Sequence, residues 1–196
     1  MNTIANNNII CTDHFLSAYT CNKIISELEF SYWNESTVYN YTYEGAISFK
    51  SDSRTSQTSF QDFFSDQLNS EIRKIENKLA AMLNIDVNNL EKWQATSYAK
   101  GGKFDLHYDC GHWKHEPSGE REKTILIYLN TPVLGGSTYF SKFDIEFKAL
   151  KGRMLTWNNL DPDGECNFDM MHSGTPLIRG RKITLVTWLR QRKYRK

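Results

Sequence analysis

Hydrophobic residues recur at helical spacing in two segments of the N-terminal half. Between residues 17 and 30, apolar side chains return every three or four positions after Ser17, a residue type that often caps a helix. Between residues 59 and 83 the same spacing continues for several turns, and Thr58 with Gln61 matches a capping box at its start. The pattern predicts two helices, each with one buried face.

After about residue 92, short runs of β-branched and aromatic residues alternate with Gly, Asn, Asp and Pro. This pattern predicts eight strands, the number that a two-sheet jelly roll requires. The expected strands lie near 92–99, 104–109, 123–130, 137–141, 144–148, 153–158, 168–172 and 181–190. Earlier in the chain, residues 38–50 have strand composition, and residues 51–58 form a polar loop that contains Arg54.

The expected fold is therefore α+β and mainly β, with a double-stranded β-helix (jelly-roll) core and packing helices from the N-terminal half. We predict a single domain over residues 1–196. Residues 1–90 would provide helical and strand support, and residues 91–190 would form the catalytic core. A length of 196 residues suits one well-buried core. The basic end RQRKYRK is expected to be a solvated tail.

Charge and composition narrow the classes of partner. Lys and Arg total 24 against 23 for Asp and Glu, so the chain has no basic footprint for nucleic acid or an anionic membrane. No apolar run approaches the roughly 18 residues of a membrane span, and MNTIANNNII does not resemble a signal peptide. We therefore expect a cytoplasmic protein that acts on a small-molecule amino acid or on a peptide or protein substrate.

The cysteines give a further expectation about the compartment. Cys11, Cys21, Cys110 and Cys166 have neither CxxC spacing nor the density of a disulfide framework. Reduced thiols in a reducing compartment are the expectation, with pairing of two of them left open.

His107 and Asp109 form the first candidate metal-binding pair. Residues separated by one in a strand point to the same side, so the pair can offer an imidazole and a carboxylate to one ion. Such a pair also arises by chance, and it gains weight from His172, which ends a later predicted strand. Two histidines and one carboxylate leave open positions on an iron ion, whereas a structural zinc site is closed.

Lys182 lies ten residues after His172 and begins the strongly β run KITLVTWL. Period two places Lys182, Thr184, Val186 and Trp188 on one wall of the barrel, with Ile183, Leu185 and Leu189 packed behind it. A cation on the inner wall suits the far carboxylate of a dicarboxylic acid whose other end chelates the metal. The alternative for Lys182 alone is a solvated lysine at a strand start.

The chain at this point resembles the prolyl 4-hydroxylase branch of the iron(II) and 2-oxoglutarate dioxygenases. The resemblance rests on the ordered motifs YAKGGKFDLHYD, REKTILIYLN, GGSTYF, KGRMLTW, NLDPDG and HSGTPLIRGRK, over about residues 88 to 190. In that family the second metal His is followed by Pro at plus four, Gly at plus eight and Lys at plus ten. Pro176, Gly180 and Lys182 stand at these offsets from His172.

The resemblance implies a role for each matching residue. His107, Asp109 and His172 would be the catalytic iron ligands. Lys182 and the Tyr98 hydroxyl would bind the distal carboxylate of 2-oxoglutarate, with a further hydrogen bond from Thr138, and Arg181 is the alternative anchor. The implied cofactor set is Fe(II), 2-oxoglutarate as co-substrate and O₂, with ascorbate as an additional candidate. Because related halogenases lack the carboxylate that Asp109 supplies, hydroxylation is favoured over halogenation.

Substrate recognition is assigned to loops, since loops at the mouth of a barrel select the substrate. The candidate elements are residues 51–58 and 110–121, and the candidate substrate residues are Arg121, Trp113 and Trp188. The alternatives are a surface arginine at Arg121 and a tryptophan at 113 that only anchors its loop.

A rival zinc cluster of Cys110, His112 and His115 lacks an evident fourth ligand and the paired spacing of structural zinc sites. Trp93 and Trp157 fall in predicted strands and are expected in the core, with the inner wall as an alternative place for Trp157.

The leading functional hypothesis is hydroxylation of an unactivated C–H in a prolyl or other amino-acid residue of a peptide, or in a free amino acid, with release of succinate and CO₂. The same cofactors in this family also serve desaturation, cyclisation or epimerisation of a small metabolite. A non-catalytic jelly-roll binding module is the alternative from another class, and it would be expected to lack a metal ligand or the lysine.

Overall fold

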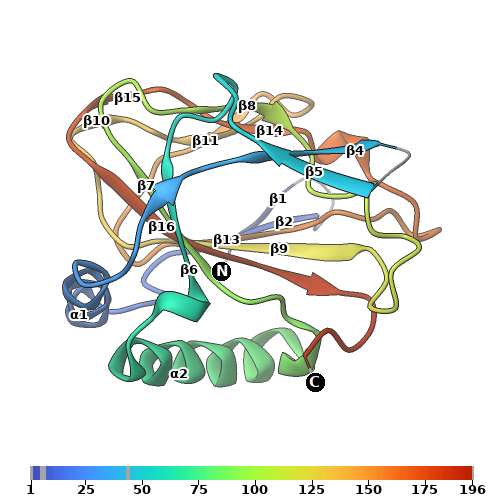
Figure 1. The fold of residues 1–196 in the computed structure, drawn as a ribbon, viewed down its shortest axis with the longest axis horizontal. Coiled ribbons are helices and arrows are strands. Elements are labelled where there is room, and N and C mark those ends of the chain that lie inside the picture. The colour runs from blue at the N-terminus through green and yellow to red at the C-terminus, as the bar shows by residue number, and fades with distance from the viewer. Residues whose placement is uncertain (1, 5–7, 43–44, 196) are drawn as a thin grey trace.

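Two antiparallel β-sheets face each other, and two helices cover the outer side of the larger sheet (Figure 1). The protein was analysed as a computed structural model, which describes residues 2–4, 8–42 and 45–195. The two facing sheets confirm the predicted jelly roll, and the fold is mainly β, as expected.

The larger sheet has eight strands, and strands from both ends of the chain contribute to it. Its order is β1 (Asn2–Ile4), β2 (Ile9–Thr12), β13 (Met154–Asn158), β9 (Arg121–Tyr128), β16 (Lys182–Arg190), β7 (Gln94–Tyr98), β6 (Gln57–Phe60) and β3 (Asn34–Glu35). Because β16 lies between β9 and β7, its inward side chains line the middle of the barrel wall.

The smaller sheet has four strands, two of which carry His107 and His172. Its order is β12 (Ile145–Phe147), β11 (Thr138–Phe140), β14 (His172–Gly174) and β8 (Phe104–His107). Two further ribbons are β10 (Leu134–Gly135) with β15 (Leu177–Arg179), and β4 (Val38–Thr42) with β5 (Gly45–Phe49).

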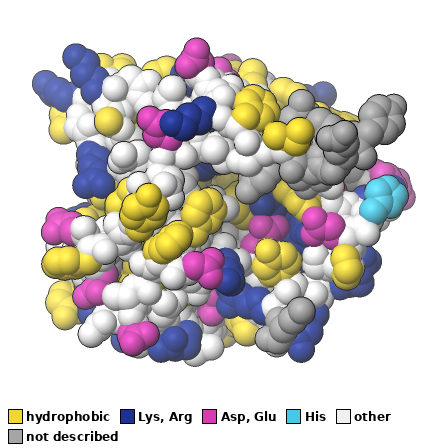
Figure 2. Space-filling view, in the orientation of Figure 1, with side chains coloured by type: hydrophobic (Ala, Val, Ile, Leu, Met, Phe, Trp, Pro, Cys, Tyr) yellow, Lys and Arg dark blue, Asp and Glu magenta, His cyan; other side chains and the backbone are white. Residues whose placement is uncertain are grey.

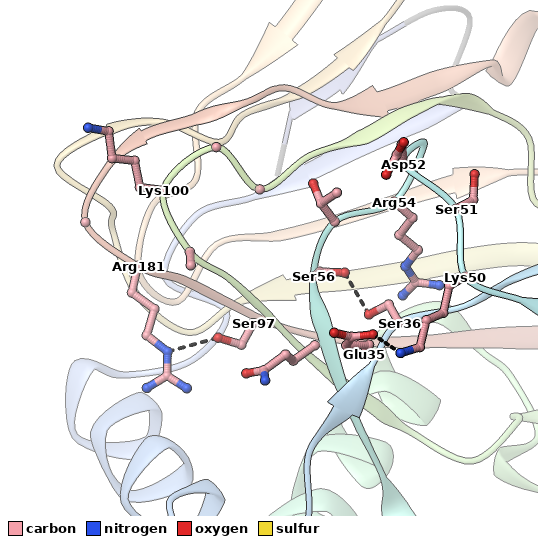
Figure 3. Close-up of a pocket in the computed structure, with 16 residues that line it drawn as sticks. Glu35, Ser36, Lys50, Ser51, Asp52, Arg54, Ser56, Ser97, Lys100 and Arg181 are labelled. Carbon is pink, nitrogen blue, oxygen red and sulfur yellow. Dashed lines mark hydrogen bonds and ion pairs between the residues drawn. The ribbon is translucent and has the colours of Figure 1, made fainter.

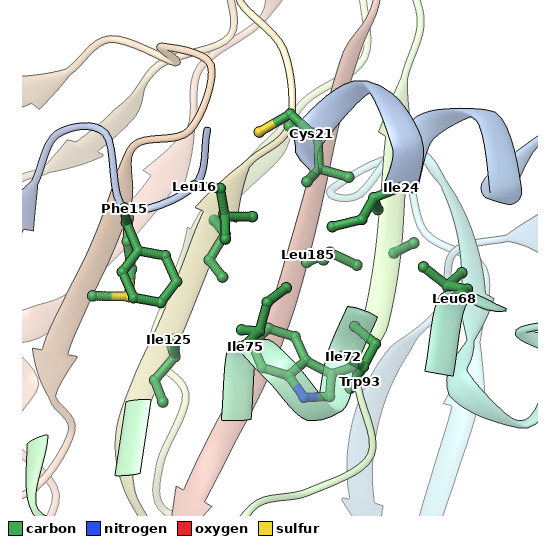
Figure 4. Close-up of a cluster of buried hydrophobic side chains, with 14 of the residues drawn as sticks. Phe15, Leu16, Cys21, Ile24, Leu68, Ile72, Ile75, Trp93, Ile125 and Leu185 are labelled. Carbon is green, nitrogen blue, oxygen red and sulfur yellow. The ribbon is translucent and has the colours of Figure 1, made fainter. Parts of the chain in front are cut away.

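Helices α1 (Ala18–Leu28) and α2 (Asp66–Leu83) bury their apolar faces against the larger sheet. Figure 4 shows Ile24 of α1 and Ile72 of α2 close to Leu185 of β16, in one hydrophobic cluster. Trp93 is fully buried there, as expected, and its indole Nε1–H donates to Glu76 at 2.9 Å. The N-terminal half therefore supports the back of the barrel wall.

The predicted start of the second helix is wrong. Phe60 ends strand β6, Gln61–Phe63 form a short 3₁₀ turn, and the helix begins at Asp66. Its cap is Ser65, whose hydroxyl accepts from the Leu68 N–H at 3.0 Å. The expected capping box at Thr58 is not formed, because Thr58 belongs to β6. The last two residues of the polar segment 51–58 are therefore part of that strand and not of a loop.

The expected strand at 168–172 is also corrected. Phe168–Met170 form a 3₁₀ turn, and the strand begins at His172 and ends at Gly174. Strands β1, β2, β3, β6, β10 and β15 have no counterpart among the predicted strands. A third 3₁₀ turn spans Val87–Asn89.

The state of the cysteines and the surroundings of the C-terminal segment differ from expectation. Cys110 and Cys166 form a disulfide, so reduced thiols were the wrong expectation for this pair, whereas Cys11 and Cys21 are free and buried. The basic C-terminal segment is also partly tied down, because the Arg195 guanidinium pairs with Glu76 at 2.8 Å.

Basic and acidic side chains are interspersed on the face shown in Figure 2, in keeping with a net charge of +1. Among the described residues, none of the helices combines the length and apolarity needed to cross a membrane.

Candidate metal and co-substrate site

The structure brings His107, Asp109 and His172 together between the two sheets. His107 ends β8 and His172 begins β14, and these two residues are register partners in the antiparallel pair. Asp109 follows two residues after His107, so its carboxylate turns to the same side. The His107 and His172 Nε2 atoms lie 3.9 and 3.6 Å from Asp109 carboxylate oxygens. Ligand atoms of all three residues lie within 4.8 Å of one another, which suits one metal ion.

Backbone carbonyls fix the orientation of both imidazoles. The His107 Nδ1–H donates to the Asp105 carbonyl oxygen at 2.8 Å, and the His172 Nδ1–H donates to the Met170 carbonyl oxygen at 2.9 Å. A carbonyl oxygen only accepts, so in the neutral form of each ring Nδ1 carries the proton and Nε2 has the lone pair. Both lone pairs are thus available to a metal on the side of Asp109.

Thr124 of β9 holds the third ligand. Its hydroxyl donates to Asp109 Oδ2 at 2.7 Å, and the Asn159 amide donates to the same hydroxyl oxygen at 2.9 Å. Desolvation opposes ionisation of Asp109, but His172, His107 and Arg121 together with the Thr124 bond lower the pKa of the carboxyl below its usual value. The carboxylate is therefore ionised and oriented.

The histidines are packed among aromatic rings. Phe104 stacks on His107 with ring centroids 3.6 Å apart, and His172 lies 4.6 Å from Trp157 and 5.5 Å from Phe140. Burial, followed by the neighbouring His172, lowers the pKa of His107 to about 3. The imidazole is neutral at ordinary pH, which is the form that binds a metal. Trp157 lines the inner wall beside His172, while its side chain is 2 % exposed.

Lys182 lies in the same cavity as the three candidate ligands. This narrow cavity has a volume of about 80 Å³, well below the roughly 300–1,000 Å³ of sites for drug-sized ligands. The Lys182 side chain is 3 % exposed, and its ammonium lies 4.0 Å from the centre of the Tyr98 ring. Burial lowers the pKa of Lys182 to about 8. Within the described part of the chain no carboxylate pairs with it.

The other predicted co-substrate residues also line this cavity. Tyr98 is the register partner of Lys182 on β7. Thr138 lies on the facing sheet, where its Oγ1 is 2.5 Å from the Tyr128 hydroxyl oxygen. The period-two reading of β16 holds, since Thr184, Val186 and Trp188 line the cavity and the alternate residues Ile183, Leu185 and Leu189 join the helix-side core. Arg181 points elsewhere, with its Nε–H donating to Ser97 Oγ at 2.9 Å.

A second, wider groove opens onto the metal candidates from outside. Its volume is about 360 Å³, and it shares Arg54, Phe104, His107, Asp109 and Trp188 with the narrow cavity. Both predicted selectivity loops contribute to it, through Ser53, Arg54 and Thr58 from one loop and His112, Trp113 and Arg121 from the other. The two spaces thus border the same two triad residues, His107 and Asp109.

Arg121 is not a surface arginine. Its guanidinium lies between the indole rings of Trp113 and Trp188, at 3.8 and 3.6 Å from their centroids. Its Nε–H and Nη2–H donate to the two carboxylate oxygens of Glu91 at 2.7 and 2.8 Å. The three candidate substrate residues thus form one stacked unit in the wall of the groove.

The rival zinc cluster is not formed, because Cys110 is disulfide-bonded to Cys166. The metal group that the described residues do form is the His107, Asp109 and His172 cluster. Sequence reasoning missed Thr124, Asn159 and Glu91. For Thr124 a signal existed: it is the polar residue before the apolar run ILIYL, at an inward position of its strand. For Glu91 and Asn159 the sequence carries no comparable pattern.

Comparison with known proteins identifies the family. The family model described as 2OG-Fe(II) oxygenase superfamily matches residues 93–190, where 2OG is 2-oxoglutarate. The chain is 30% identical over 128 residues to prolyl 4-hydroxylase subunit alpha-1 of Gallus gallus, which covers 62% of this chain and 25% of that protein. The human subunit alpha-1 is 28% identical over 128 residues. The chain thus spans about a quarter of the length of the curated relatives it matches.

Solved structures share the fold. A viral collagen prolyl hydroxylase from Paramecium Bursaria Chlorella virus-1, in complex with 2OG, superimposes with a TM-score of 0.68 at 23% identity, covering 93% of this chain and 96% of that chain. A Pseudomonas putida prolyl-4-hydroxylase gives 0.58 at 17% identity, covering 94% and 93%. This chain belongs to the 2OG-Fe(II) oxygenase superfamily, and part of it is similar to prolyl 4-hydroxylase alpha subunits.

Proposed function

We propose that this enzyme hydroxylates an amino-acid residue within a peptide chain, with proline as the first target, and releases succinate and CO₂. The observation that carries the proposal is the pair of connected spaces at the triad. A narrow cavity contains the buried cation, and a groove of about 360 Å³ opens from the surface onto His107 and Asp109. The first suits a small dicarboxylic acid, and the second suits part of a longer chain.

The donor set fits iron(II). His107 Nε2, His172 Nε2 and one Asp109 carboxylate oxygen would hold the ion, and two histidines with one carboxylate leave positions for other ligands. Bound iron supplies the activation of O₂ that hydroxylation requires. The chain's own contribution is to orient both Nε2 atoms and the carboxylate toward one point, through the Asp105 and Met170 carbonyls and the Thr124 hydroxyl.

Lys182 would bind the distal carboxylate of 2-oxoglutarate. The ammonium is buried without a carboxylate partner in the described residues, so a dicarboxylic acid would restore the missing counter-charge. Tyr98 and Thr138 line the same end of the cavity and would add hydrogen bonds. Restricted space around these groups also excludes water from the reacting atoms.

The groove supports a peptide substrate. Arg54 contributes a guanidinium that donates to the Thr37 carbonyl at 3.2 Å, and the stack of Trp113, Arg121 and Trp188 contributes flat aromatic surface. A pyrrolidine ring packs well on such a surface, and guanidinium groups donate to peptide carbonyls. The groove is also open at the surface, so the chain on either side of the target residue has room to leave it.

Turnover with a peptide panel tests the proposal. Purified protein is given Fe(II), 2-oxoglutarate and O₂ with proline-containing peptides, matched peptides in which alanine replaces proline, and free proline. Mass spectrometry reports gain of one oxygen atom and succinate formation is followed in parallel. We expect hydroxylated peptide only when proline is present, and no product from Asp109→Ala. Succinate formation without hydroxylation of any peptide, but with modification of free proline, would contradict the peptide assignment.

A further inference from the structure

A third and larger cavity lies beside the substrate groove and has no role in the proposed reaction. Its volume is about 970 Å³, and the segments that line it come from residues 35–36, 50–57, 97–102 and 180–181. Figure 3 shows that these segments surround an open space, with Lys100 and Arg181 on one side and Asp52 and Arg54 on the other. The lining is rich in Ser, Thr, Gly and charged residues and poor in large apolar side chains.

The charge of this cavity is unbalanced toward positive. Four basic residues, Lys50, Arg54, Lys100 and Arg181, face two acidic ones, Glu35 and Asp52. Lys50 is paired with Glu35. Arg181 and Lys100 are exposed, and no carboxylate pairs with either in the parts of the chain that the structure covers.

Arg181 is held in a fixed direction. Its Nε–H donates to Ser97 Oγ at 2.9 Å, and Ser97 is buried, so the hydroxyl anchors one edge of the guanidinium. This leaves the outer N–H groups of the fork for a ligand, and a guanidinium fork matches a carboxylate in geometry. Lys100 adds positive charge at the rim on the same side, away from Asp52 (Figure 3).

The cavity adjoins the substrate groove. Glu35, Ser36 and Arg54 line both spaces, and Arg54 also lines the narrow metal cavity. A chain that places its target residue at the triad can therefore pass Arg54 and enter the larger cavity. Resting on the proposed peptide hydroxylation, we infer that this cavity binds the flank of the substrate and selects acidic side chains there, chiefly through Arg181 and with Lys100 as a second contact.

A peptide series tests the inference. A single Glu is placed at successive positions before and after the target proline in an otherwise neutral peptide, and each peptide has a Gln counterpart. At the positions that reach the cavity we expect the wild-type kcat/KM to favour Glu over Gln by about two- to fivefold, as for an exposed ion pair, mainly through KM. Raising the salt concentration should reduce the preference.

Variants assign the preference to the cavity. Arg181→Gln should bring the Glu-to-Gln ratio close to one, Lys100→Gln should reduce it, and Arg181→Lys should retain part of it. Lys193→Gln is the matched control, since it removes a charge from an exposed residue that does not line the cavity, and it should keep the wild-type ratio. Circular dichroism of each variant verifies folding.

Peptide binding is measured separately by fluorescence anisotropy with labelled Glu and Gln peptides, without O₂. Equal kcat/KM for every Glu and Gln pair, or a preference that survives Arg181→Gln in full, overturns the inference while leaving peptide hydroxylation intact. If no peptide is hydroxylated but the Glu peptide binds more tightly and Arg181→Gln abolishes that difference, peptide hydroxylation fails and the acidic-flank site stands.

Discussion

The affinity for the co-substrate should depend on pH through the ionisation of Lys182. Burial lowers its pKa to about 8, and only the protonated ammonium can pair with a carboxylate. The affinity for 2-oxoglutarate should therefore be steady below about pH 7 and fall by up to about tenfold per unit above pH 8. Anaerobic titration of the Fe(II) protein with 2-oxoglutarate at a series of pH values measures this.

Pyruvate provides the control for this titration. It has the same 2-oxo acid group for the metal and lacks the distal carboxylate, so its affinity should not follow the ionisation of Lys182. A parallel loss of pyruvate and 2-oxoglutarate affinity would contradict the role of Lys182 and point to the metal ligands instead. The variant Lys182→Ala should raise the 2-oxoglutarate concentration required for turnover.

Thr124 is expected to tune metal affinity, although it does not itself belong to the triad. Its hydroxyl orients Asp109 through a 2.7 Å hydrogen bond. Thr124→Val preserves shape and removes that bond, so Fe(II) affinity should fall by about 10-fold or more. Thr156→Val is the control, because Thr156 is equally buried and its hydroxyl has no hydrogen-bond partner among the described residues. Equal Fe(II) affinities in equilibrium dialysis of the two variants would contradict this role.

The sequence predicts well to which side a side chain points where spacing along one strand determines that direction. His107 and Asp109 are two apart, and Lys182 to Trp188 alternate along β16, so period two places them without knowledge of the fold. The sequence does not predict the ion pair of Glu91 and Arg121. The two partners are 30 residues apart, and only the pairing of β9 with β16 in the folded sheet brings them together.

At the scale of elements, Ser65 determines where α2 begins. Its hydroxyl accepts from the Leu68 N–H and donates to Glu27 Oε2 at 2.6 Å, which links α2 to α1. Ser65→Ala should lower the free energy of unfolding by about 1 kcal/mol or somewhat more, because a cap and an inter-helix bond are lost together. Ser65→Thr retains both bonds and should remain near the wild type in urea denaturation. Equal stability of the alanine and threonine variants would contradict this.

Element boundaries were the weaker part of the sequence prediction for a physical reason. Phe60 and Phe64 fit the helical spacing of the residues after Asp66, but Phe60 is paired with Gln94 in the sheet. A ladder of backbone hydrogen bonds to β7 is a tertiary interaction, and it overrides the local periodicity. The existence of both helices and of the strands around the triad was predictable because their patterns are long or strongly β.

For the whole molecule, the disulfide between Cys110 and Cys166 joins two loops that flank the site. It closes a loop of 56 residues in sequence separation. Replacing both cysteines by serine should lower the free energy of unfolding by about 2–4 kcal/mol. Denaturation with and without reductant checks this, since reductant should affect the wild type and spare the double variant. Four reactive thiols in the unreduced, denatured wild type would contradict the disulfide.

The disulfide could not be predicted from the composition of the chain. Four scattered cysteines carry no pairing information, and only the folded loops place Cys110 beside Cys166, with Lys114 and Glu165 paired 2.6 Å apart across the same loops. Disulfides persist in oxidising compartments, so the argument from reduced thiols to a reducing compartment no longer holds. The jelly roll itself was predictable, because it follows from the number and spacing of the strands.

The central claim is that His107, Asp109 and His172 hold an iron ion which 2-oxoglutarate then chelates beside Lys182. Anaerobic addition of Fe(II) and 2-oxoglutarate, followed by visible absorption spectroscopy, tests it most directly. The account predicts a metal-to-ligand charge-transfer band in the wild type, the same band at higher 2-oxoglutarate concentration in Lys182→Ala, and no band in His172→Ala. Folded wild-type protein that shows no band, or a His172→Ala variant with an undiminished band, would contradict it.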